Sequence, residues 1–200
     1  IPLKMTDKRN NLITYAEAVY LVYFTVMLGA RAIGLYEGML IYNISLVAGM
    51  LLFICKIAMT EHTVLEYGWM GFLLLLSLVV YHNTGEKGLL VYFTMMLGVK
   101  SVSMKHIFKV GAVVWTAAFC GMFLLTLAGV IDDVCFMHEK HGIGYVICHS
   151  MGYPHPNVFH ISYLVLMSFI LYLVHPQSKK GHFRMLLLMM IGNVFVFLYS

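Results

Sequence analysis

The chain has 200 residues, of which 61% are hydrophobic and only 11% are Asp, Glu, Lys or Arg. Soluble domains are about half apolar and a quarter charged, so this composition excludes an ordinary soluble domain and predicts a multi-pass membrane protein. The net charge of +4 comes from Lys and Arg in short connecting segments and not from a basic patch, so we expect no nucleic-acid partner.

Seven apolar segments are candidates to cross a bilayer, whose hydrocarbon core needs about 20 apolar helical residues. They are residues 12–30, 39–59, 64–81, 88–100, 110–131, 158–174 and 185–200. The sequence therefore predicts an all-α fold, a polytopic transmembrane bundle of about seven helices in a single membrane-embedded region, 1–200. The fourth segment is the shortest and can be extended or re-entrant. Because the chain starts at Ile1 and stops inside an apolar run, we expect a fragment of a longer protein.

The positions of Lys and Arg predict the orientation, because these residues are retained on the cytoplasmic side. If the N-terminus is cytoplasmic, ten of the 13 lie on the inner side and three on the outer side. The inner ones are Lys4, Lys8, Arg9, Lys56, Lys100, Lys105, Lys109, Lys179, Lys180 and Arg184, and the outer ones are Arg31, Lys87 and Lys140. We therefore expect a cytoplasmic N-terminus, with residues 132–157 on the outer face.

This outer segment, 132–157, carries most of the unusual side chains. Its histidines are His138, His141, His149 and His155, which lie among Asp132, Asp133, Glu139, Cys135 and Cys148. Neither an HExxH nor a CxxC spacing occurs, so we expect no metal and no cofactor, and histidines without a specific role are the simpler interpretation. A disulfide between the two cysteines is permitted on this side of the membrane, but two cysteines do not establish a pairing.

Residues 150–157 predict a rigid polar turn before the sixth span. Pro154 and Pro156 restrict the backbone, and Gly152 permits a tight turn. Asn157 stands where it can cap the first turn of the helix, whose free N–H groups attract anions such as phosphate. The alternative is a helix start preceded by a stiff turn that has no ligand.

The run from His149 to Asn157 (HSMGYPHPN) resembles the R-x-S-L-G-[FY]-x-[HN]-P-N signature of O-antigen and capsular polysaccharide polymerases of Gram-positive type. Residues 142–146 and 100–108 are also similar to that family, and the likeness covers about residues 85–175. The family signature has arginine where this chain has Cys148. His149, Lys140 or His141 then supplies the positive charge, or this copy is impaired.

The resemblance implies a glycosyltransferase of the bacterial cytoplasmic membrane that polymerises oligosaccharide repeats carried on undecaprenyl diphosphate. It implies no cofactor, and its partners would be the lipid-linked oligosaccharide, the bilayer and other polysaccharide-assembly proteins. Catalytic roles then fall on His155, His149 and His141. Substrate contacts fall on Cys148, Ser150, Gly152, Tyr153, Pro156, Asn157 and Lys140.

Two other functions stay open from the sequence. A transporter is suggested by the multi-span layout, but the span centres are nearly free of ionisable residues, which transporters usually place there. A non-catalytic accessory subunit is favoured if Cys148 abolishes phosphate binding. Glu17 lies near the cytoplasmic end of the first span, where contact with water explains it, and snorkelling at a helix end explains Arg31.

Overall fold

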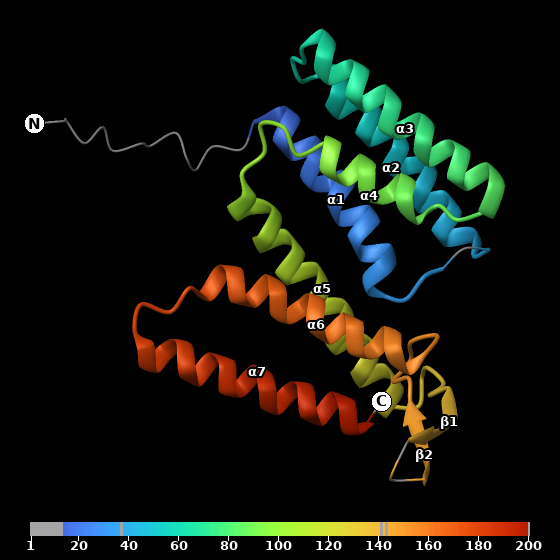
Figure 1. Cartoon of the computed structure of the whole chain (residues 1–200), viewed down its shortest axis with the longest axis vertical. Helices are drawn as coiled ribbons and strands as arrows, with labels where there is room; N and C mark the ends of the chain where they lie inside the picture. Colours follow the sequence, from blue (N-terminus) through green and yellow to red (C-terminus); the bar gives the residue numbers. More distant parts are fainter. Residues whose placement is uncertain (1–13, 37, 141, 143, 200) are drawn as a thin grey trace, which may run out of the picture.

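The computed structural model describes residues 14–36, 38–140, 142 and 144–199, and this part of the chain forms seven helices and one two-stranded sheet. The helices are α1 (Tyr15–Ala32), α2 (Leu40–Ala58), α3 (Val64–Thr84), α4 (Gly88–Leu97), α5 (Met104–Leu127), α6 (Pro156–Val174) and α7 (Lys179–Tyr199). The strands β1 (Cys135–Lys140) and β2 (Gly144–His149) lie between α5 and α6 (Figure 1). The predicted all-α bundle of seven helices is confirmed.

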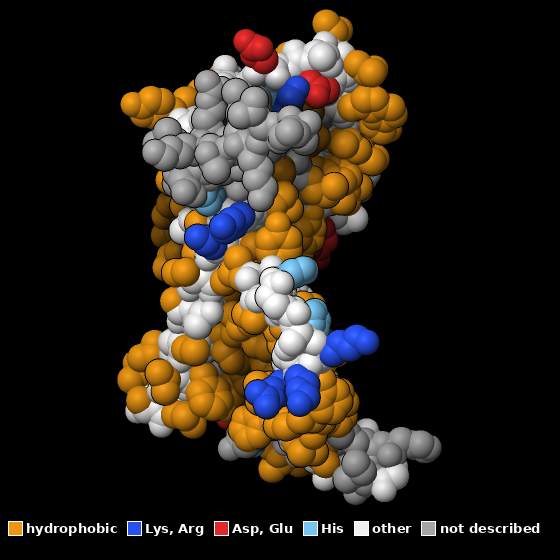
Figure 2. Space-filling model, turned by 90° about the vertical axis from the view of Figure 1, so that its left-hand side faces the viewer, with side chains coloured by type: hydrophobic (Ala, Val, Ile, Leu, Met, Phe, Trp, Pro, Cys, Tyr) orange, Lys and Arg blue, Asp and Glu red, His pale blue; other side chains and the backbone are white. Residues whose placement is uncertain are grey.

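Five of the described helices, α2, α3, α5, α6 and α7, are long and apolar enough to cross a membrane. Hydrophobic side chains cover most of the surface seen in Figure 2, with Lys and Arg gathered in a few small groups. Since water would not solvate such a surface, the chain is a multi-pass membrane protein. The ten residues of α4 extend only about 15 Å, so this helix is too short to span the core alone.

The remaining helix, α1, lies inside the bundle and packs against α2 and α5. Tyr20 and Tyr23 are almost completely buried on it. The Tyr20 hydroxyl donates to the carbonyl of Met95 at 2.9 Å, and the Tyr23 and Thr94 hydroxyls lie 2.7 Å apart. These contacts join α1 to α4. Because the neighbouring helices shield α1 from lipid, its polar groups can be tolerated inside the bundle.

Polar contacts link helix ends into two groups, one at each end of the bundle. Ends that the sequence analysis predicts on the same side of the membrane fall in the same group. At one end, Lys56 Nζ donates to the Lys100 carbonyl, and the N–H of Ser103 donates to Glu17. At the other, Lys87 Nζ donates to Asn43 Oδ1 at 3.3 Å. The first group holds the ends predicted to be cytoplasmic, and the cytoplasmic orientation itself stays a prediction.

Two helices start about six residues earlier than the sequence analysis expected. α5 begins at Met104 and not near residue 110, and α7 begins at Lys179 and not near residue 185. Both early turns are basic, with Lys105 and Lys109 in α5. Apolar content alone defined the predicted spans, and polar turns that extend a helix into the headgroup region carry no apolar signal.

Glycines bring neighbouring helices into close contact. A Cβ added at Gly111 of α5 would collide with the ring of Phe169 on α6, and one at Gly192 of α7 would collide with the Tyr163 hydroxyl of α6. Small residues at such crossings let backbones approach, which is a main source of attraction between helices in lipid. The α5–α6–α7 half of the bundle therefore depends on these two positions.

We predict that Gly111→Ala destabilises the protein by about 1–3 kcal/mol, because the new methyl group overpacks the Phe169 contact. Gly121→Ala, on the same helix, is the matched control, since an added Cβ there meets nothing within 4 Å and alanine favours the helix. Thermal unfolding of detergent-solubilised protein measures the difference. Equal melting temperatures for the two variants would contradict this packing.

Candidate functional site

A β-hairpin stands at the end of the bundle predicted to face outward, a feature that the sequence analysis did not predict. β1 and β2 pair antiparallel, with Cys135 opposite His149 and Phe136 opposite Cys148. Because side chains alternate across a strand, Cys135 and His149 share one face of the hairpin, whereas Phe136 and Cys148 share the other. The mixed composition of residues 132–149 hid the alternation that usually reveals strands.

A tight turn follows β2 and redirects the chain into α6. The N–H of Tyr153 donates to the Ser150 carbonyl at 3.0 Å, and the two central residues, Met151 and Gly152, have φ of 50° and 83°. Two positive φ values define a type I′ turn, a conformation that is strained for methionine. The N–H of Met151 donates to Asp133 Oδ1 at 2.8 Å, which holds this strained residue in place. Gly152 therefore makes the tight turn that was predicted for it.

Several predicted substrate-binding residues are buried. Cys148, Ser150 and Tyr153 are 3%, 0% and 1% exposed, and Pro156 is also buried. The Tyr153 hydroxyl donates to the carbonyl of Ala32 at 3.1 Å, and burial raises its pKa to about 12. Tyr153 therefore positions the turn against the end of α1, and all four side chains are enclosed by protein.

The start of α6 differs from the prediction. His155, and not Asn157, is the N-cap residue, and its Nδ1 accepts the N–H of Asn157 at 3.1 Å. Pro156 occupies the first helical position, where its fixed φ suits a helix and its missing N–H leaves nothing unpaired. The proposed capping by Asn157 is thus wrong, because proline starts the helix two residues earlier. Asn157 itself is exposed and His155 is half-buried.

His155 has aromatic neighbours from the hairpin. Its ring centroid lies 4.8 Å from that of Phe136 and 6.1 Å from that of His138. Cys148 lies opposite Phe136 on the same hairpin face. Cys148, at the position of the signature arginine, therefore shares a hairpin face with Phe136, whose ring packs against His155.

The opposite face of the hairpin carries a compact cluster of Asp133, Cys135 and His149. His149 Nδ1 lies 2.6 Å from Asp133 Oδ2 and 3.5 Å from Cys135 Sγ. Burial tends to raise the pKa of Asp133, but hydrogen bonds from His149 and Met151 outweigh it and the pKa is lowered. Burial and the neighbouring Asp133 carboxylate raise the pKa of the Cys135 thiol. A raised pKa disfavours the thiolate form of Cys135.

Two cations lie at the same end of the bundle. The guanidinium carbon of Arg31 lies 5.5 Å from the centre of the Tyr42 ring, and Lys87 bonds to Asn43. Arg31 is next in sequence to Ala32, whose carbonyl binds Tyr153. The motif turn and these two cations therefore belong to one end of the molecule.

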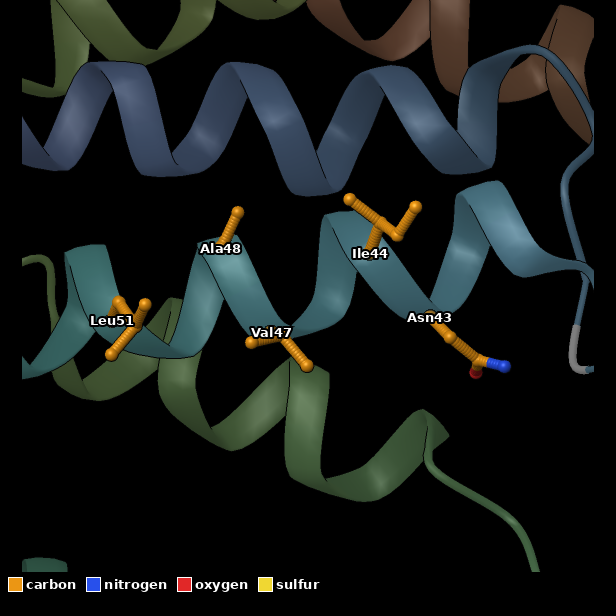
Figure 3. A pocket seen from close by; sticks show the side chains of 5 residues that line it. All are labelled: Asn43, Ile44, Val47, Ala48 and Leu51. Carbon is orange, nitrogen blue, oxygen red and sulfur yellow. The ribbon is translucent and has the colours of Figure 1, made fainter.

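A shallow groove of about 400 Å³ runs along α2 from Asn43. Figure 3 shows its lining residues, all of which come from α2: Asn43, Ile44, Val47, Ala48 and Leu51. Apart from Asn43 the lining is aliphatic, and Ile44, Val47 and Leu51 are each about 60% exposed. The groove is therefore an apolar surface directed at lipid, with a polar group at the end near Lys87.

A second polar cluster lies at the opposite end of the bundle. Glu17 is 5% exposed and accepts hydrogen bonds from the N–H of Ser103 and from His106 Nδ1 at 2.8 Å. Lys56 is 1% exposed and donates to Thr60 and to the Lys100 carbonyl. Contact with water does not account for such a buried Glu17. The sequence analysis also missed the burial of Lys56, because nothing in the sequence gives the carbonyl that receives it.

The side chains of two predicted site residues lie outside the described part of the structure. His141 lies outside the described residues, and Lys140 is placed as the last residue of β1 by its backbone alone. Cys135 and Cys148 are both free thiols on opposite hairpin faces, so they form no disulfide with each other.

No family model matches this chain, and neither do curated proteins or solved structures.

We predict that Asp133 controls the order of the motif turn. Asp133→Ala removes a charged acceptor, so amide hydrogen exchange in the peptide containing Met151 should accelerate about 10–100-fold, as expected for loss of about 1.5–3 kcal/mol. Exchange followed by mass spectrometry at pH 7 measures this. An unchanged rate would mean that the turn holds without the carboxylate.

The acid dependence of the same exchange is a separate prediction. The pKa of Asp133 in the folded protein is below its ordinary value of 3.8, so its stabilising effect is present above that pH and is lost as pH falls through the folded pKa. Asp133→Asn is the reference, because both proteins share the same intrinsic exchange. The slower exchange of the wild type should persist at pH 5 and disappear in strong acid. A wild-type advantage that is lost already at pH 5 would contradict it.

Proposed function

We propose that this chain is part of a polymerase that extends a surface polysaccharide from undecaprenyl-diphosphate-linked repeats at the outer face of the bacterial cytoplasmic membrane. The observation that carries the proposal is the 149–157 motif. It forms a rigid turn at the end of the bundle, immediately before an apolar helix, with His155 and Asn157 accessible at the helix start. This location suits a reaction on a glycan whose lipid carrier stays in the membrane.

The reaction needs two kinds of group. A hydroxyl of the acceptor repeat attacks the anomeric carbon of the donor glycan, so that a new glycosidic bond forms while the bond to the diphosphate breaks. The hydroxyl proton must go to a base, and negative charge develops on the departing undecaprenyl diphosphate. We assign the base to His155, whose Nδ1 takes the proton once it releases the Asn157 N–H that it accepts in this structure. Asn157 then positions the sugar. His149 is a second candidate, although its Nδ1 already contacts Asp133.

The diphosphate needs fixed positive charge, and Cys148 is a buried thiol that cannot provide it. Arg31 and Lys87 are the cations that we assign to this role. Arg31 adjoins the residue that anchors Tyr153, and Lys87 bonds to Asn43 at the end of the α2 groove. We assign the groove itself to the prenyl chain, since a shallow apolar groove that faces lipid and ends near two cations is complementary to a lipid diphosphate.

The two alternatives fare differently. A transporter would place ionisable groups near the bilayer midplane, whereas Glu17 is the third residue of α1 and Lys56 is the third from the end of α2. A non-catalytic accessory role is the second candidate, and the observation that favours it is the thiol at position 148.

We predict that His155→Ala abolishes long-chain surface polysaccharide in cells whose own copy is replaced by the variant. His155→Asn is the matched comparison, because asparagine is a good N-cap and keeps the helix start while removing the imidazole. If His155 is the base, both variants lose polymer, with chain length read on gels and protein abundance checked by immunoblot. We expect Asn157→Ala to lose polymer as well.

The outcomes separate chemistry from folding. Activity that is lost in His155→Ala but retained in His155→Asn would assign the residue a capping role only. Normal polymer in His155→Asn, His155→Ala and Asn157→Ala, at normal abundance, would exclude the polymerase and leave the accessory role.

We also predict that Arg31→Gln and Lys87→Gln each reduce polymer synthesis at least tenfold, since a fixed cation that contacts the leaving group contributes a few kcal/mol to the transition state. Lys179→Gln is the control, because this exposed lysine starts α7 at the opposite end of the bundle from the proposed site. Equal activity of the three variants would remove Arg31 and Lys87 from the site.

A further inference from the structure

The cluster of Asp133, Cys135 and His149, on the hairpin face opposite Phe136 and Cys148, has a property that the glycan proposal does not use. Asp133, Cys135 and His149 offer an oxygen, a sulfur and a nitrogen donor, all within 4.8 Å of one another. These are the donor types that zinc takes in proteins. No sequence motif indicates this cluster. Asp133 precedes β1 and Cys135 is its first residue, whereas His149 is the last residue of β2 and comes close to them only through strand pairing.

The donor distances fit a tetrahedral ion. Bonds of about 2.0–2.1 Å to nitrogen, 2.3 Å to sulfur and 2.0–2.2 Å to oxygen place the donor atoms roughly 3.4–3.6 Å apart. Cys135 Sγ lies 3.5 Å from His149 Nδ1 and 3.8 Å from Asp133 Oδ2. Only the separation between His149 and Asp133, now 2.6 Å, has to increase, by somewhat less than 1 Å.

The surroundings hold these donors in position. Cys135 and His149 are directly opposite one another in the antiparallel ladder, so the backbone fixes their spacing. The other carboxylate oxygen of Asp133 accepts the N–H of Met151 at 2.8 Å and lies 3.5 Å from the Ser150 hydroxyl. Hydrogen bonds that orient a ligand from behind are a regular feature of metal sites. The cluster is partly open to solvent, with 37% of the His149 side chain and 24% of the Asp133 side chain exposed.

We propose that Asp133 Oδ2, Cys135 Sγ and His149 Nδ1 bind one Zn²⁺ ion, with a fourth position open to water. Binding joins the first residue of β1, the last residue of β2 and the residue that holds the Met151 turn, so the ion fastens the hairpin to the start of the motif. Coordination requires both Cys135 Sγ and His149 Nδ1 to lose a proton: the thiol proton goes to solvent, and the proton that Nδ1 shares with Asp133 moves to Nε2 of the same ring. The ion then takes the place of the hydrogen bond between His149 and Asp133. This inference stands independently of the proposed polymerase activity.

Cobalt titration tests the site, because Co²⁺ substitutes for Zn²⁺ and reports its ligands by colour. The protein is purified in detergent with a tag that lacks histidine, kept reduced and titrated with Co²⁺. We expect one equivalent to give a thiolate-to-cobalt charge-transfer band together with the intense visible bands of tetrahedral cobalt. Added Zn²⁺ should displace it, and Zn²⁺ should raise the melting temperature.

The variants decide which donors are involved. Cys135→Ser should abolish the charge-transfer band and lower Zn²⁺ affinity at least 100-fold. Loss of a residue that only hydrogen-bonds to a metal ligand already lowers affinity about 10–100-fold, and loss of a ligand itself should cost more. Cys148→Ala is the control, because this buried thiol lies on the opposite hairpin face, so its cobalt spectrum and Zn²⁺ affinity should match the wild type. His149→Gln should weaken Zn²⁺ binding as Cys135→Ser does. Wild-type protein without a charge-transfer band, or a band that persists in Cys135→Ser, would overturn the proposal.

Discussion

A peptide group inside a lipid bilayer has no water to bind, so its N–H and C=O must find partners within the protein. This constraint makes the spanning segments helical and confines other backbone geometry to the ends of the bundle. The hairpin of β1 and β2 and the turn with Met151 in a left-handed conformation both lie outside the long apolar helices. The same constraint explains why buried polar side chains such as Thr94 bond to neighbouring helices. Chemistry is therefore concentrated where helices begin and end.

The helices could be predicted from the sequence because apolar length is a strong signal. The predicted bounds of the second span, 39–59, differ from α2 by one residue at each end. The errors arise where polar residues belong to a helix, as in the first turns of α5 and α7. The hairpin was missed because strands of six residues with mixed side chains produce no clear period.

The tight turn before α6 could be predicted from the sequence, but its contacts could not. The motif pointed to the segment before α6, and a tight turn at Gly152 was correctly expected. Nothing in the sequence indicated that Asp133 would reach the backbone of Met151, 18 residues away, or that Tyr153 would bond to Ala32 at the end of α1. Such contacts depend on strand register and on how α1 packs, and both are properties of the assembled chain.

The burial of the motif also changes what a resemblance on these residues means. Ser150 and Tyr153 are enclosed, Gly152 has a positive φ that L side chains rarely adopt, and Pro156 starts the helix, so each matched residue answers a requirement of folding. His155 and Asn157 are different, since they are the matched residues with access to solvent around the helix start. A motif of this kind specifies a scaffold first, and only its accessible residues can specify a reaction. In the polymerase that we propose, Arg31 and Lys87, outside the motif, supply the charge that holds the diphosphate.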